Sequence, residues 1–314
     1  MEKDKATPSD HSTAKISEEL REAMEGRQFN SLDEVQAFAD RHTQRHNQRP
    51  RDEFHGLSPE QMYQFLHAPF AAPELVHFPE VLDTTPVARV LTLFTMLAEA
   101  IGEQGLKATA KGNLPQKFCR EAAQTFRHED TLPKHSWFRN VNREVDFFDL
   151  HVTRLVAELA GLVRKRKGHF ILSRDCRSLL AGEGASTIYP RLLKTYIEQF
   201  NWAYWDGLPE IRFIQSAFLF TLYLLTRYGD SWRPHTFYED CFLNAFPMLV
   251  HEIPPDTIGE PDTQIRNGYT WRTLVDFADF FGLAAVEPVS EQLFYRKYRV
   301  KSLPLLHDAV RFLI

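Results

Sequence analysis

The chain has 314 residues, of which 43% are hydrophobic, so it can bury a sizeable core, and its length corresponds to about two domains. Its formal net charge of −5 argues against a protein coated in basic surface for nucleic acid, although a local basic patch is compatible with that total because salt screens distant charges. The 25 Phe, 10 Tyr and 5 Trp residues predict a dense aromatic core, since each large ring buries much area.

The cysteines and the most apolar stretch bear on the compartment of the protein. Cys119, Cys176 and Cys241 are far apart and show no Cys-x-x-Cys spacing, which predicts buried free thiols in a reducing cytosol rather than disulfides or a zinc site. The segment Met1–Lys15 lacks the apolar run of a signal peptide. Polar side chains interrupt the apolar stretch Ile211–Tyr228, which therefore predicts a buried helix. We expect a cytoplasmic protein with no membrane span.

The N-terminal part is predicted to be a disordered tail over residues 1–16, with too few apolar residues to offset ordering, and a helical segment over residues 17–82. Ser31 and Ser58 each begin a sequence with capping-box spacing, and each therefore predicts the start of a helix. The interval from 68 to 83 is rich in Pro and is predicted to be extended.

His42 and His46 are four residues apart on the first of these helices, a spacing that can place two imidazoles on one metal. A third ligand and the adjacent Glu of a metalloprotease motif are missing, so the pattern favours a polar helix end and no metal site.

A local pattern then occurs three times: an apolar helix ends near a Gly, a short extended stretch follows, and a Thr or Ser begins another helix. The extended stretches end at Thr109, Ser173 and Ser302. The second copy is the clearest, because Gly161-Leu162 ends a helix and the turn Arg166-Lys167-Gly168 joins two predicted strands. The spacing of the copies is irregular, so they do not predict a solenoid.

Between the second and third copies, the sequence predicts a helical block with helices over residues 189–202, 209–228 and 235–249. The middle helix is apolar nearly all round, as expected for a helix surrounded by others.

The layout of the repeated pattern resembles a winged-helix module, in which a β-hairpin wing joins two helices. The resemblance implies a mainly α protein with small β-hairpins, built as tandem winged-helix-like modules on a helical core. Two modules are expected within residues 83–187, and a third closes the helical block of residues 188–314. In similar bacterial regulators, the helix before the wing reads DNA bases. The helix near Leu150–Leu159 is not rich in Arg, Asn or Gln, so the resemblance does not extend to base reading.

Two short stretches resemble a family of uncharacterised bacterial proteins. Phe54–Met62, continuing to Ala68-Pro69-Phe70, is similar to a GLSPxQM…PF signature, and Leu106–Pro115 is similar to an LTxxGNLP signature. The family has no assigned activity, so the resemblance implies no catalytic residues.

The predicted hairpin of the second copy contains the sharpest candidate site. Arg164, Lys165, Arg166 and Lys167, with His169, place four adjacent cations at a hairpin tip, where they could contact phosphates and gain affinity by counterion release. The alternative is a solvated turn. Lys297, Arg299 and Lys301 form a second basic strand, and the period of two places them on one face.

The sequence contains no P-loop, Gly-x-Ser-x-Gly or Gly-x-Gly-x-x-Gly motif, so we expect no cofactor and no catalytic residue of those types. We predict a non-enzymatic interaction protein whose winged-helix-like surfaces bind DNA or a protein partner. The rings of Trp202, Tyr204 and Trp205 could stack on bases, although packing in the core is the simpler explanation.

The alternative is an enzyme with its site in the aromatic block of residues 189–252. A concave pocket that brings together His235, Glu239, Asp240 or His251 would favour this alternative.

Overall fold

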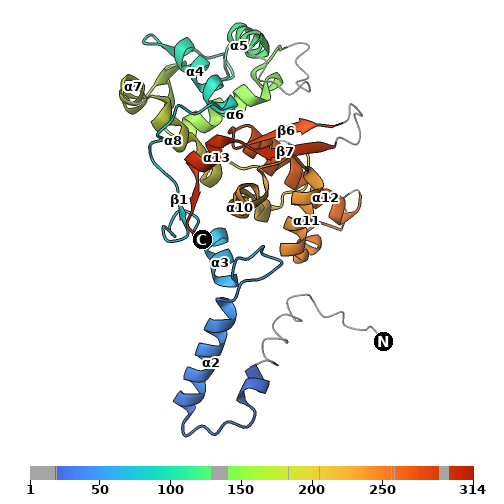
Figure 1. Cartoon of the computed structure of the whole chain (residues 1–314). Coiled ribbons are helices and arrows are strands. Elements are labelled where there is room, and N and C mark those ends of the chain that lie inside the picture. The colour runs from blue at the N-terminus through green and yellow to red at the C-terminus, as the bar shows by residue number, and fades with distance from the viewer. Residues whose placement is uncertain are drawn as a thin grey trace.

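The computed structural model describes residues 18, 20–128, 141–182, 184–204, 206–255, 257, 259–289 and 297–314. Within these residues the protein is mainly α, with small antiparallel sheets, as the sequence predicts (Figure 1). The disordered tail predicted over residues 1–16 lies outside the described residues. No described helix has the length and apolar character needed to cross a membrane.

A short helical stretch over residues 20–24 precedes α2 (Leu32–Asn47) and α3 (Pro59–His67). The Ser31 hydroxyl accepts a hydrogen bond from the Glu34 N–H, and Ser58 forms a full capping box with Gln61, so both predicted helix starts are confirmed. Helix α2 extends away from the rest of the molecule in Figure 1. Among the described residues, no group of three or more His, Cys, Asp or Glu side chains could hold a metal ion.

The first of two similar units contains, in chain order, α4 (Arg89–Ile101), β2 (Leu106–Lys107), α5 (Gln116–His128), the short helix η1 (Glu144–Asp146), α6 (Phe148–Leu159), β3 (Val163–Arg166), β4 (His169–Leu172) and α7 (Arg174–Ala181). Its sheet has the order β2-β4-β3, with all pairs antiparallel. The two copies predicted within residues 83–187 thus contribute to one sheet. Strand β2 has only two residues and forms no hairpin of its own. It pairs instead with the edge of β4 that β3 leaves free.

The second unit repeats this order with α10 (Phe218–Tyr228), β5 (Arg233–Pro234), α11 (His235–Ala245), η2 (Pro247–His251), α12 (Pro261–Tyr269), its wider π-type continuation η3 (Thr270–Asp279), β6 (Ala284–Pro288), β7 (Tyr298–Ser302) and α13 (Pro304–Ala309). Its sheet has the order β5-β7-β6. In both units the third helix ends at a Gly-Leu pair: Gly161 has φ 69° and Gly282 has φ 68°. The N–H of the following leucine then donates to a carbonyl of the same helix, at 2.9 Å for Leu162 and at 2.8 Å for Leu283.

Helices α8 (Ala185–Glu198) and α9 (Arg212–Ser216) connect the two units, and one continuous hydrophobic core runs through both. As predicted, α10 is buried nearly all round, and the core is rich in aromatic rings. Trp202 is 4% exposed and its ring lies 4.5 Å from that of Phe277, so it packs in the core, whereas Trp205 lies outside the described residues.

The chain ends beside its Pro-rich segment. Strand β1 (Val76–His77) pairs with β8 (Arg311–Phe312), which ties residues 68–83 to the C-terminus. The three cysteines are buried and free, as the sequence predicts. Burial raises the pKa of Cys119 to about 12 and of Cys241 to about 11, so neither thiol is poised to react.

Candidate functional site

The outer face of the β2-β4-β3 sheet gathers basic side chains from three strands. Lys107 of β2 and Arg166 of β3 both stand opposite His169 of β4, so their side chains share one face. Arg164 is two residues from Arg166 and lies on the same face. Lys167 occupies the hairpin turn, with a φ of 49°. These five residues are called the basic face below.

The charges of the basic face are not neutralised within the described part of the chain. Lys107, Arg164, Arg166 and Lys167 are all exposed. No carboxylate among the described residues pairs with any of these four cations. The face therefore presents a concentrated positive charge to solvent on a protein whose net charge is negative.

Lys165, which the sequence groups with its neighbours, points to the other side of the sheet. It stands opposite the buried Phe170, its Nζ lies 5.0 Å from the centre of that ring, and the Glu158 carboxylate is 4.0 Å away. Because successive strand residues point to opposite faces, the run of four cations is split. Lys165 is also exposed, but its amine lies beside Phe170 and Glu158 and does not join the basic face.

The second sheet carries the other predicted basic strand. Arg299 and Lys301 stand opposite Glu287 and Ala285 on its outer face, and Lys297 is exposed two residues before Arg299. Arg299 is paired, because its Nη2 lies 2.6 Å from the Glu287 carboxylate and its guanidinium packs on the Trp232 ring. This strand is therefore less positive than the basic face of the first sheet.

Helix α6, which precedes the β3-β4 hairpin, is buried along most of its length. Leu150, Val152 and Val156 are all at most 5% exposed, and so are the polar side chains of His151 and Arg154. Because α6 packs against α4 and α8, a helix in this position cannot enter a DNA groove without coming away from these helices.

The polar side chains of α6 surround a buried carboxylate, that of Glu144. Its Oε1 accepts hydrogen bonds from Arg154 Nε at 2.8 Å and His151 Nδ1 at 2.7 Å, and its Oε2 accepts one from the Leu114 N–H. Burial by itself raises the pKa of Glu144, but the hydrogen bond from His151 and the charge of Arg154 outweigh it and hold the pKa below its ordinary value. The cluster is satisfied internally and anchors α6 to the loop before α5.

Most side chains of the alternative enzyme site are engaged in ion pairs and hydrogen bonds. Glu239 is buried, accepts a hydrogen bond from Thr270 at 2.6 Å, and has His235 3.8 Å away. Arg266 pairs with Asp240 at 2.7 Å, while His251 is exposed on η2. The acids are thus neutralised in an ion-pair network, which is a typical structural arrangement.

A second charged cluster joins the two units. Arg89 of α4 pairs with Asp149 of α6 at 3.3 Å and with Asp279 of η3 at 3.1 Å. Asp276 lies near them in a small aromatic-lined space. Burial and the nearby Asp149 charge raise the pKa of Asp276 to about 7.

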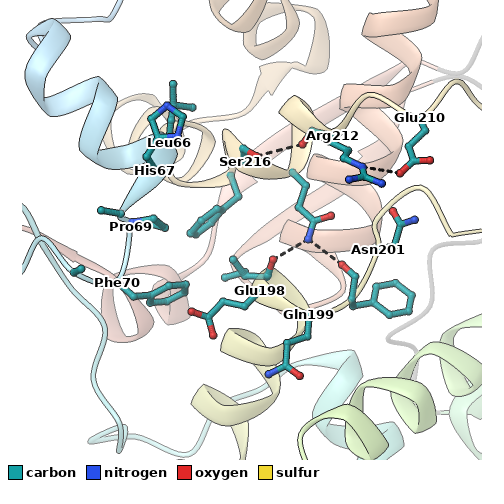
Figure 2. A pocket seen from close by; sticks show the side chains of 16 residues that line it. Leu66, His67, Pro69, Phe70, Glu198, Gln199, Asn201, Glu210, Arg212 and Ser216 are labelled. Carbon is teal, nitrogen blue, oxygen red and sulfur yellow. Dashed lines mark hydrogen bonds and ion pairs between the residues drawn. The ribbon is translucent and has the colours of Figure 1, made fainter.

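An open groove of about 770 Å³ lies between the end of α3, the end of α8 and α9 (Figure 2). At one edge Arg212 pairs with Glu210 at 3.0 Å, and the Ser216 hydroxyl donates to the Arg212 carbonyl. The Gln215 amide is held by the carbonyls of α8 and of the loop after it. Most of these polar groups are therefore engaged with one another.

Residues 83–185 match the family described as the Y4jL N-terminal domain, and this range covers the whole first unit, from the segment before α4 to the start of α8. The match is consistent with the predicted resemblance to an uncharacterised family; it includes Leu106–Pro115 and leaves out Phe54–Met62. No curated protein and no solved structure matches the chain.

Sequence reasoning missed Lys107 as a member of the basic face. Its only local signal is one charge in a two-residue strand, and its partner His169 is 62 positions later in the chain, as the register Lys107↔His169 shows. It also missed Glu144, Arg154 and Arg89, whose partners come from other elements.

Proposed function

We propose that this protein binds the phosphate backbone of nucleic acid through the basic face, with its two units acting as winged-helix-like modules. The observation that carries the proposal is the set of cations on one side of the first sheet, at Lys107, Arg164, Arg166 and Lys167, with no carboxylate partner among the described residues. Exposed cations that displace condensed counterions supply sequence-independent affinity for DNA.

The order of elements in each unit supports the winged-helix comparison. Three helices, with a short strand after the first, are followed by a hairpin, and the short strand pairs with the returning strand of that hairpin. In such a module the hairpin is the wing, and here the wing of the first unit carries Arg164, Arg166 and Lys167.

The burial of α6 limits what this binding can recognise. Because α6 packs inside the protein, the proposed contact is made by the wing alone and involves phosphates more than base edges. We therefore expect similar affinity for duplexes of unrelated sequence and strong dependence on salt.

The test is the binding of a fluorescent random-sequence duplex, followed by anisotropy between about 50 and 200 mM salt. Affinity falls as salt rises, and each phosphate contact contributes about 0.9 to the steepness of log affinity against log salt. The variant Arg164→Gln/Arg166→Gln/Lys167→Gln should therefore make this dependence less steep by about 3.

Lys165→Gln is the matched control, because this exposed lysine lies in the same hairpin but points to the other side of the sheet, toward Phe170 and Glu158. It should leave the slope unchanged. Absence of binding by the wild type at low salt, or an equal loss in Lys165→Gln, would reject the proposal; the exposed wing would then be examined as a contact for an acidic protein.

A further inference from the structure

A cavity of about 480 Å³ lies beneath the Pro-rich segment, where residues 73–82 pass over α8. It is separate from the basic face and adjoins the groove of Figure 2 at Phe70, which lines both. Its volume is within the range of about 300–1,000 Å³ that is usual for small-molecule sites.

A proline inside α8 builds the wall of this cavity. Pro190 has no N–H, so the carbonyl of Ser186, one turn earlier, has no helical partner. The Leu82 N–H donates to that carbonyl at 3.0 Å. The segment is thus tied to α8 at Leu82 and to β8 at Val76, and it spans the cavity between these two points.

The interior of the cavity is apolar. Val76, Leu82, Tyr189 and Leu193 are buried side chains that line it. The Tyr189 hydroxyl donates to the Phe281 carbonyl at 2.6 Å, so the polar end of this ring is satisfied elsewhere. An apolar chain or ring can therefore enter without burying an unpaired polar group of the wall.

The mouth of the cavity carries the cation of Lys194, which has no carboxylate partner among the described residues. Lys194 is exposed, its Nζ lies 5.1 Å from the centre of the Phe70 ring, and no described carboxylate pairs with it. Arg191 also lines the cavity, but its guanidinium is held by Asp175 and by the Ala160 carbonyl. Glu80 is the acidic residue of the same lining, and it opposes the attraction of Lys194 for anions.

We propose that this cavity binds a small amphipathic carboxylate. The apolar body of the ligand lies between the Pro-rich segment and α8, and its carboxylate pairs with Lys194. Such a site goes beyond the proposed binding of nucleic acid, because it uses none of the residues of the basic face.

The test is isothermal titration of the full chain with naphthoate and with naphthol, which share a ring system but differ in charge at neutral pH. Naphthoate should bind at one saturable site, about ten-fold more tightly than naphthol, as one charge-assisted contact implies. Lys194→Gln should weaken naphthoate about ten-fold without changing naphthol, and Glu80→Gln should strengthen naphthoate. Lys117→Gln, an exposed lysine of α5, is the matched control and should change neither.

Leu179→Trp is a second variant, which fills the cavity from α7 and should abolish binding of both compounds. If it unfolds, the two exposed variants still decide the question. The proposal is overturned if the wild type shows no saturable binding, if naphthol binds as tightly as naphthoate, or if Lys194→Gln binds naphthoate like the wild type.

Discussion

Asp276→Asn is expected to stabilise the protein at alkaline pH. Among the described residues none donates a hydrogen bond to the Asp276 carboxylate, although its backbone carbonyl accepts one from Tyr196 at 2.9 Å. Asp149 lies nearby with the same charge, and Arg89 is already shared by Asp149 and Asp279. Ionised Asp276 is thus poorly compensated, whereas an amide has no charge to bury.

The size of the effect follows from the pKa. A rise from 3.8 to about 7 corresponds to roughly 4 kcal/mol of destabilisation when the group is ionised. Asp276 is only partly buried, so about 2 kcal/mol is expected after allowance for solvent screening. Because the folded state holds the proton more tightly, wild-type stability falls as pH rises from 3.8 to about 7, and the loss is complete above that pH.

The assay is thermal unfolding at several pH values from about 4 to 8. At pH near 8 the variant should melt about 4 °C above the wild type, and the difference should shrink toward pH 4. Glu252→Gln, which removes an exposed carboxylate elsewhere, is the control and should show no such trend. Equal melting temperatures at pH 8, or an advantage that persists unchanged in acid, would refute this account of the junction.

Two other predictions concern the packing of the units. Glu144→Gln leaves the buried Arg154 guanidinium with less counter-charge and should lower the free energy of unfolding, measured in urea at neutral pH, by about 3 kcal/mol. Glu158→Gln, at the solvent edge of the same cluster, should lower it by less. Equal losses would argue against the buried pair. Gly282→Ala places a Cβ 2.5 Å from a backbone oxygen at a φ of 68°, and should destabilise the folded protein by about 2 kcal/mol or more. Gly168→Ala, at a φ of 74° but in open space, should destabilise it by about 1 kcal/mol. The reverse order would contradict the close packing at Gly282.

Local features of this protein were predictable from the sequence because they depend on neighbouring residues. The helix starts at Ser31, Ser58 and Ser173 each need only a side-chain oxygen and an N–H three residues later. The hairpin at 163–172 depends on its Lys167-Gly168 turn, and the burial of α10 follows from its continuous apolar sequence.

The basic face, the burial of α6 and the cavity depend on contacts between residues far apart in the sequence. Strand β2 has only two residues, and nothing near it in sequence indicates that it adds Lys107 to a basic face built by β3 and β4. The burial of α6 depends on α4 and α8 packing against it, and the cavity under residues 73–82 depends on a carbonyl left free by Pro190. The sequence by itself determined the capped helix starts at Ser31, Ser58 and Ser173 and the hairpin at 163–172. The tertiary structure decided which faces stay exposed, because exposure depends on contacts between elements far apart in the chain.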